Sequence, residues 1–266
     1  MGLVSLFADA GQSTELVMEH MLEDNDSSYP LIAVPELFSG LEDATVQKLL
    51  AYAENGGSLL LTGANTCRIF EKASRAFTAE DAGGGLVTYG DMEYAAVQDA
   101  LVFQAENAET VAVFSKNYRE EARPFAVVLP YGSGKLALIG ADVGLAYNTS
   151  AQYALRRLIE KTTALLYSPT ARIEGALGLL ELTLLEKDGK TMLQLVNANG
   201  SHVGKNHATW DMLPPVCDVR LSVEAAEGTQ FLLQPEGRAL VPEYRDGRAY
   251  LTIGNVEIHS IVEMIP

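Results

Sequence analysis

The sequence has few cysteines and few positive charges, and it lacks any long apolar run. Its 266 residues include two cysteines, Cys67 and Cys217, which lie far apart in the chain. Two thiols so placed build no disulfide framework, and a structural zinc site needs about four ligands. No apolar run reaches the roughly 20 residues that a membrane-spanning helix requires. The first ten residues also lack the basic start of a signal peptide, so a cytoplasmic protein is expected.

Acidic residues dominate the charge of the chain. Asp and Glu number 35 against 19 Lys and Arg, which gives a formal net charge of −16. This charge repels nucleic-acid phosphates and anionic membrane surfaces, so neither a nucleic acid nor a membrane is an expected partner. The carboxylates do not cluster at the spacing of a metal-binding loop. We therefore expect neither a metal nor any other cofactor.

The first two-thirds of the chain alternates between apolar runs and amphipathic segments. One amphipathic segment ends at Asn55-Gly56-Gly57, and glycine is common just after the carboxyl end of a helix. Because a predicted strand lies on each side of this helix, residues 31–62 are predicted to form a βαβ unit. Continuous apolar strands are typical of parallel sheets that are covered on both faces. We therefore expect an α/β domain over residues 1–168, with a flavodoxin-like, mostly parallel sheet and flanking helices. The expected strands are 3–7, 31–34 and 58–62, and the expected helices are 15–23, 41–54 and 151–166.

The middle of this domain is harder to interpret. Gly83-Gly84-Gly85 predicts a flexible break within residues 64–100. Short strands are expected at 101–103 and 110–114. Two further strands, at 125–129 and 135–139, flank a turn rich in glycine and predict a β-hairpin.

After Pro169 the helical period disappears and short alternating runs take over. Turn signals such as Asn199-Gly200 and Asp246-Gly247 separate these runs. Several short strands at this spacing predict a small all-β sandwich over residues 169–266. The expected strands are 180–186, 192–197, 219–223, 229–233, 249–253 and 257–264.

Polar residues follow several predicted strands of the first domain. In a parallel sheet these residues gather at its carboxyl edge, where ligands usually bind. A carboxylate pair such as Glu36 and Asp142 can perform acid/base work in glycoside hydrolysis, but the sequence does not set their separation. We assign no catalytic residue. The candidate ligand-binding residues are Glu36, Asn65, Thr66 and Asp142.

Two motifs suggest chemistry that the surrounding sequence does not support. Residues 132–135 (GSGK) resemble part of a phosphate-binding loop, but Leu136 follows the lysine and the loop joins two strands. A hairpin turn is favoured, because no helix begins there to hold a phosphate. Cys67 follows a strand, but a nucleophilic cysteine needs a histidine base, and His20 is the only histidine in this domain. A partly buried, ordinary thiol is favoured.

The remaining histidines and the single tryptophan lie in the second domain. His202 and His207 have the spacing of a metal-binding pair, but no nearby acid or cysteine completes a site. His259 lies in the last predicted strand, where a structural histidine is favoured. Trp210, together with tyrosines of the same domain, is a candidate platform for stacking a sugar, although aromatic residues in sandwiches more often belong to the core.

Several sequence segments of the first domain resemble those of a known family. Residues 29–36 (YPLIAVPE), the helix after them and residues 56–63 (GGSLLLTG) resemble the glutamine-amidotransferase-like domain of glycoside hydrolases. That domain is best known as the trimerisation domain of family 42 β-galactosidases. Residues 131–140 (YGSGKLALIG) and the later helix fit the end of the same domain.

The second domain resembles the β domain that follows it in bacterial glycosyl hydrolases and α-L-fucosidase-like proteins. The similar segments are residues 195–197, 213–215 and 256–261. The resemblance thus covers nearly the whole chain.

Two departures limit what this resemblance implies. Amidotransferases carry a Gly-x-Cys-x-Gly elbow and a later His-x-Glu, whereas Gly63 and Cys67 are four residues apart and no His-x-Glu exists. The related hydrolases keep their glycosidase residues in an upstream TIM barrel, for which this sequence has no room. The resemblance therefore implies a non-catalytic accessory or oligomerisation region of a glycoside-hydrolase-like protein. Its expected partners are further copies of the chain and an upstream TIM barrel.

Two other functions stay open at this point. One is a carbohydrate-binding module that holds a sugar at the sheet edge or on Trp210. The other is a free-standing hydrolase that acts on a glycoside or an amide.

Overall fold

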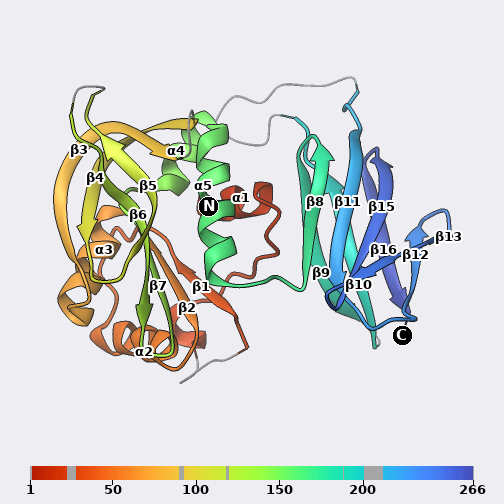
Figure 1. Ribbon diagram of the computed structural model, residues 1–266, viewed down its shortest axis with the longest axis horizontal. Helices are drawn as coiled ribbons and strands as arrows, with labels where there is room; N and C mark the ends of the chain where they lie inside the picture. Colours follow the sequence, from red (N-terminus) through yellow and green to blue (C-terminus); the bar gives the residue numbers. More distant parts are fainter. Residues whose placement is uncertain are drawn as a thin grey trace. The chain divides into compact units, whose positions relative to one another are not determined.

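The computed structural model divides into two compact units (Figure 1). It describes residues 2–22, 28–89, 93–117, 120–187, 189–200 and 212–265. The first unit comprises Met1–Leu6 and Leu16–Ser168, and the second comprises Phe7–Glu15 and Pro169–Pro266. No helix in these described ranges is both long enough and apolar enough to cross a membrane.

A seven-stranded mixed sheet forms the centre of the first unit, in the order β1-β2-β7-β6-β5-β3-β4. The α/β class is confirmed, but the expectation of a mostly parallel sheet is wrong, because hairpin connections make the second half antiparallel. The parallel strands are β1 (Leu31–Val34), β2 (Ser58–Thr62) and β7 (Gly134–Ile139). The antiparallel strands are β6 (Arg123–Tyr131), β5 (Glu109–Ser115), β3 (Thr78–Tyr89) and β4 (Glu93–Gln104).

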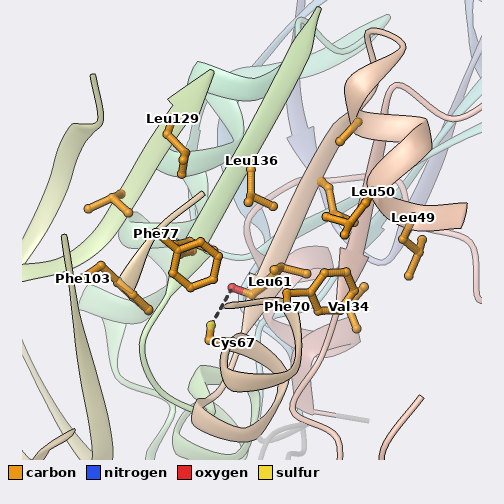
Figure 2. Packing of buried hydrophobic residues seen from close by; sticks show 14 of the residues in the cluster. Val34, Leu49, Leu50, Leu61, Cys67, Phe70, Phe77, Phe103, Leu129 and Leu136 are labelled. Atoms are coloured by element: carbon orange, nitrogen blue, oxygen red, sulfur yellow. Dashed lines mark hydrogen bonds between the residues drawn. The ribbon is translucent and has the colours of Figure 1, made fainter. Parts of the chain in front are cut away.

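Helices cover both faces of this sheet. The first βαβ crossover is the expected one, with α2 (Asp43–Glu54) between β1 and β2, and α3 (Ala64–Ser74) follows β2. Both helices bury apolar side chains against one face of the sheet (Figure 2). In this core the rings of Phe77 and Phe103 pack edge to face, with their centroids 5.8 Å apart. On the other face, α5 (Tyr153–Leu166) packs against β4, β5, β6 and β7.

The antiparallel half of the sheet curves so that β4 meets the chain just after β7. The Leu101 N–H donates to the Gly140 carbonyl at 2.7 Å, and the Gly140 N–H donates to the Phe125 carbonyl at 3.1 Å. A Cβ atom on Gly140 would lie 2.1 Å from the Leu101 oxygen, so glycine is required there. Part of the carboxyl edge, where a ligand crevice was expected, is thus occupied by β4.

The second unit is an all-β sandwich, as the alternating pattern predicts. Its two antiparallel sheets enclose one apolar core, to which Leu193, Leu221, Phe231 and Leu251 contribute. One sheet contains β13 (Arg238–Leu240), β12 (Gln230–Gln234), β16 (His259–Ile265), β10 (Lys190–Asn197) and β9 (Leu180–Lys187). The other contains β14 (Glu243–Arg245), β15 (Arg248–Val256), β11 (Val216–Glu224) and β8 (Ala171–Leu177).

Three local predictions are wrong. The expected strand at 3–7 is the helix α1 (Gly2–Asp9), because a short apolar run fits either structure. Of the expected helix at 15–23, the described residues 15–22 contain only one 3₁₀ turn, η1 (Glu19–Met21), whose residues are not buried. The expected break at Gly83–Gly85 lies inside β3, where two register shifts against β4 mark a bulge.

Candidate functional site

Three of the four candidate residues meet at the amino end of α3. The Glu36 carboxylate, just beyond β1, accepts the backbone N–H of Asn65 at 3.1 Å and that of Thr66 at 3.3 Å. A carboxylate is favoured there, because the first turn of a helix has unpaired N–H groups and a positive dipole end. Gly63, at φ 96°, leaves room for it, since a Cβ would lie 1.9 Å from a Glu36 carboxylate oxygen. Glu36 therefore caps α3.

The side chains of Asn65 and Thr66 hold the loop that carries Glu36. The Thr66 hydroxyl donates to the Pro35 carbonyl at 2.7 Å and accepts the Leu37 N–H at 3.0 Å. The Asn65 side-chain amide donates to the Leu37 carbonyl. We call the hydrogen bonds that Glu36, Asn65 and Thr66 make across this loop the Glu36 bracket. These bonds fix the backbone of residues 35–37 against α3.

Asp142 caps a different helix. It follows β7, and its carboxylate accepts the Leu145 N–H at 2.8 Å, which caps the helix α4 (Val143–Ser150). Within the described ranges, no hydrogen bond joins Asp142 to Glu36, Asn65 or Thr66. Both carboxylates of the predicted acid/base pair thus accept backbone N–H groups at helix ends. The sequence placed each of them correctly after a strand, but it did not predict that each caps a helix.

Cys67 is fully buried in α3, rather than partly buried as expected (Figure 2). Its Sγ lies 4.0 Å from the Leu61 carbonyl and 3.8 Å from the Ile139 carbonyl. Burial strongly raises the pKa of the Cys67 thiol, and the Glu36 carboxylate raises it further. A thiol held neutral and covered by protein does not act as a nucleophile.

Thiol labelling tests this placement of Cys67. We expect a chromogenic thiol reagent to modify one thiol per native chain quickly, because Cys217 is partly exposed and Cys67 is not. A Cys217→Ser variant should show almost no fast labelling until denaturant unfolds it. Fast labelling of the native Cys217→Ser variant would show that the Cys67 thiol is accessible.

The segment that resembles a phosphate-binding loop is a hairpin turn, as favoured above. It joins β6 to β7 and packs against the end of α2. The Ser133 N–H donates to the Glu54 carbonyl at 2.8 Å, and the Lys135 N–H donates to the Gly57 carbonyl at 3.1 Å. The Lys135 ammonium donates to the Leu165 carbonyl at the end of α5. The backbone and the lysine of this segment thus bind other parts of the protein.

The histidines and the tryptophan build no site in the described ranges. His20 lies in η1 and His259 at the start of β16, and both are exposed. His202, His207 and Trp210 lie outside the described residues. In the part of the chain that is described, no three side chains of His, Cys, Asp or Glu converge in a way that fits a metal ion.

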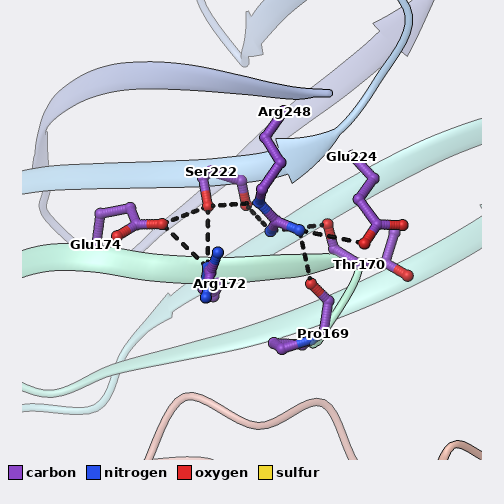
Figure 3. A network of polar contacts seen from close by, with 7 residues as sticks. All are labelled: Pro169, Thr170, Arg172, Glu174, Ser222, Glu224 and Arg248. Atoms are coloured by element: carbon purple, nitrogen blue, oxygen red, sulfur yellow. Dashed lines mark hydrogen bonds and ion pairs between the residues drawn. The ribbon is translucent and has the colours of Figure 1, made fainter. Parts of the chain in front are cut away.

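A buried arginine in the second unit is a feature that the sequence did not reveal (Figure 3). Arg248 is 6% exposed. Its guanidinium donates to the carbonyls of Pro169, Thr170 and Ser222, at 3.1, 3.2 and 3.3 Å. It also contacts the Ser222 hydroxyl and the Glu224 carboxylate, each at 3.2 Å. Arg248 thereby holds the first residues after Ser168 on β11 and β15.

Comparison with known proteins gives matches to solved structures alone. No family model and no curated protein matches the sequence. α-L-Fucosidase isoenzyme 2 from Paenibacillus thiaminolyticus matches 99% of this chain with a TM-score of 0.78 at 15% identity. A β-galactosidase from Bacillus circulans sp. alkalophilus matches 99% with a TM-score of 0.58 at 12% identity. The E323A catalytic mutant of Gan42B, a GH42 β-galactosidase from G. stearothermophilus, matches 99% with a TM-score of 0.57 at 13% identity.

The chain spans less than half of each of these proteins. It covers 44% of the fucosidase, 37% of the Bacillus enzyme and 36% of Gan42B. At such low identity the matches establish the fold alone. The resemblance to glycoside hydrolases that the sequence indicated is confirmed at that level: nearly the whole chain has the fold of a part of these enzymes.

Proposed function

We propose that this chain is a non-catalytic accessory and oligomerisation region of a glycoside-hydrolase-like protein. The observation that carries the proposal is the fold match, which takes in 99% of this chain and 36–44% of three glycoside hydrolases. On this proposal the first unit is a glutamine-amidotransferase-like domain of the trimerisation type. It supplies contacts between subunits, and a TIM barrel elsewhere in the protein supplies the hydrolytic residues.

The chemistry of the candidate site supports a role without catalysis. Glu36 and Asp142 each accept hydrogen bonds from backbone N–H groups at the start of a helix, so both carboxylates are used in capping helices. The Cys67 thiol is buried and neutral, so it fits neither an amidase nor any other cysteine-based mechanism.

A panel of nitrophenyl glycosides tests the absence of catalysis. We expect the full chain to release no nitrophenol above the buffer rate from α-L-fucoside, β-D-galactoside or β-D-mannoside. Turnover that disappears in Glu36→Gln or Asp142→Asn would contradict the proposal and support a free-standing hydrolase. A glycan array addresses the remaining alternative, because saturable binding that is lost with the same substitutions would support a carbohydrate-binding module.

A further inference from the structure

A side chain closes the outer edge of β4. β4 ends the seven-stranded sheet, so among the described residues no further strand pairs with that edge. At Ala96 the Gln152 side chain takes the place of a strand. Its amide oxygen accepts the Ala96 N–H at 2.8 Å, and its amide nitrogen donates to the Ala96 carbonyl at 3.3 Å. Both backbone groups of Ala96 are therefore bonded as a neighbouring strand would bond them.

Ser150 fixes the orientation of this amide. The Ser150 hydroxyl donates to the Ala146 carbonyl at 2.8 Å, so it accepts the 2.8 Å bond from the Gln152 amide nitrogen. That nitrogen has two N–H groups, and Ala96 and Ser150 accept one each. The Gln152 oxygen then faces the Ala96 N–H. We call the Gln152 side chain the β4 clamp.

The first half of β3 has the same arrangement on its own outer side. β5 pairs with β3 at Leu86–Thr88, so within the described ranges no strand pairs with Ala79 on that side. The Glu71 carboxylate accepts the Ala79 N–H at 2.9 Å, and the Arg68 guanidinium donates to the Ala79 carbonyl at 2.6 Å. A 3.0 Å ion pair joins Arg68 to Glu71, and we call this pair the β3 clamp. In each clamp, one side-chain acceptor and one side-chain donor bond both backbone groups of a single alanine.

The strands behind the clamps have features that favour pairing with another chain. β3 and β4 are each 12 residues long, and residues 94–98 (YAAVQ) contain neither a charged side chain nor a proline. An open edge of this length and composition is a template for strand addition and aggregation, and native proteins cover such edges. The clamps cover these edges at Ala79 and Ala96.

We infer that the β3 and β4 clamps keep the β3–β4 hairpin from accepting a strand of another chain. This inference goes beyond the proposed function, because it concerns a contact between chains that the fold prevents. A strand that added at Ala96 would displace Gln152 from both backbone groups. Gln152 is tethered beside Ala96 in the same chain, whereas an incoming strand loses translational and rotational freedom on binding. The tethered amide therefore has the advantage.

Amide hydrogen exchange tests the β4 clamp locally. Gln152→Ala is compared with the wild type and with Gln47→Ala, which truncates an exposed glutamine of α2. We expect the Ala96 amide to exchange on the order of 5-fold faster in Gln152→Ala, as loss of one hydrogen bond predicts, and at the wild-type rate in Gln47→Ala. The Leu101 amide, which donates to Gly140, should keep its rate and so show that β4 stays in place. An unchanged Ala96 rate in Gln152→Ala would overturn the assignment of the clamp.

Thioflavin T fluorescence of agitated samples tests whether the clamp blocks strand addition. Gln152→Ala should form dye-binding assemblies after a shorter lag than the wild type and Gln47→Ala. Adding Ala96→Lys to Gln152→Ala should restore the wild-type lag, because a lysine on an edge strand opposes pairing. The added lysine makes the net charge of −16 less negative, so stronger overall repulsion between chains cannot be the cause of that recovery.

Two results of this assay would overturn the inference. In one, Gln152→Ala assembles no faster than the wild type, so the clamp does not protect the edge. In the other, Ala96→Lys leaves the shorter lag unchanged, so assembly follows from lost stability and not from the opened edge. The dye reports cross-β assembly and not reversible association of folded chains, so neither result depends on the proposed oligomerisation.

Discussion

Replacing Arg248 with methionine is expected to lower the free energy of unfolding of the second unit by about 3 kcal/mol. The methionine side chain replaces much of the aliphatic part of arginine, but it has no hydrogen-bond donor. The carbonyls of Pro169, Thr170 and Ser222 then lose a charged partner in a buried setting (Figure 3). The ion pair with Glu224 adds less, because the Glu224 side chain is half exposed and water screens it.

Arg245 provides the matched control for this substitution. Its side chain is 62% exposed, and it meets Glu243 at 3.9 Å. Arg245→Met should therefore change the free energy of unfolding by less than about 1 kcal/mol. Urea unfolding followed by circular dichroism measures both variants. Equal midpoints for Arg248→Met and Arg245→Met would show that the buried network does not stabilise the unit.

A Gly134→Ala substitution is expected to destabilise the first unit by about 3 kcal/mol. Gly134 begins β7, and an added Cβ would lie 2.1 Å from the Gly57 carbonyl oxygen and 2.3 Å from the Ala53 carbonyl oxygen. Both are backbone atoms, so neither can rotate away as a side chain does. The methyl group would push the β6–β7 hairpin off the end of α2.

A glycine in open space provides the control for Gly134. A Cβ on Gly40 would meet no atom within 4 Å, so Gly40→Ala should change stability by no more than about 0.5 kcal/mol. Thermal unfolding of both variants measures the difference. A Gly134→Ala protein as stable as the wild type would contradict the close backbone packing between this hairpin and the end of α2.

Local patterns in the sequence predicted those parts of the fold that depend on neighbours in the chain. The βαβ unit around α2, the hairpin of β6 and β7, and six strands of the sandwich each follow from a periodicity and a turn signal within a few residues. The strands β8, β13 and β14 were not predicted. The helix α1 was mistaken for a strand because a short, mostly apolar run fits either structure.

Features that depend on contacts distant in the sequence could not be predicted from these patterns. The bond between Leu101 and Gly140 curves the sheet, and no signal near either residue indicates it. Arg248 binds carbonyls some 80 residues earlier in the chain, and backbone carbonyls have no sequence signature. The candidate site lies between these cases. The ends of two predicted strands indicated that Glu36 lies near Asn65 and Thr66, but no pattern in the sequence indicated that Glu36 caps α3.

Sedimentation equilibrium of the unmodified chain over a wide range of concentrations tests the proposed function most directly. The account predicts a reversible assembly whose mass approaches a whole multiple of 28.7 kDa as the concentration rises. A single species of 28.7 kDa at every concentration would contradict the oligomerisation role.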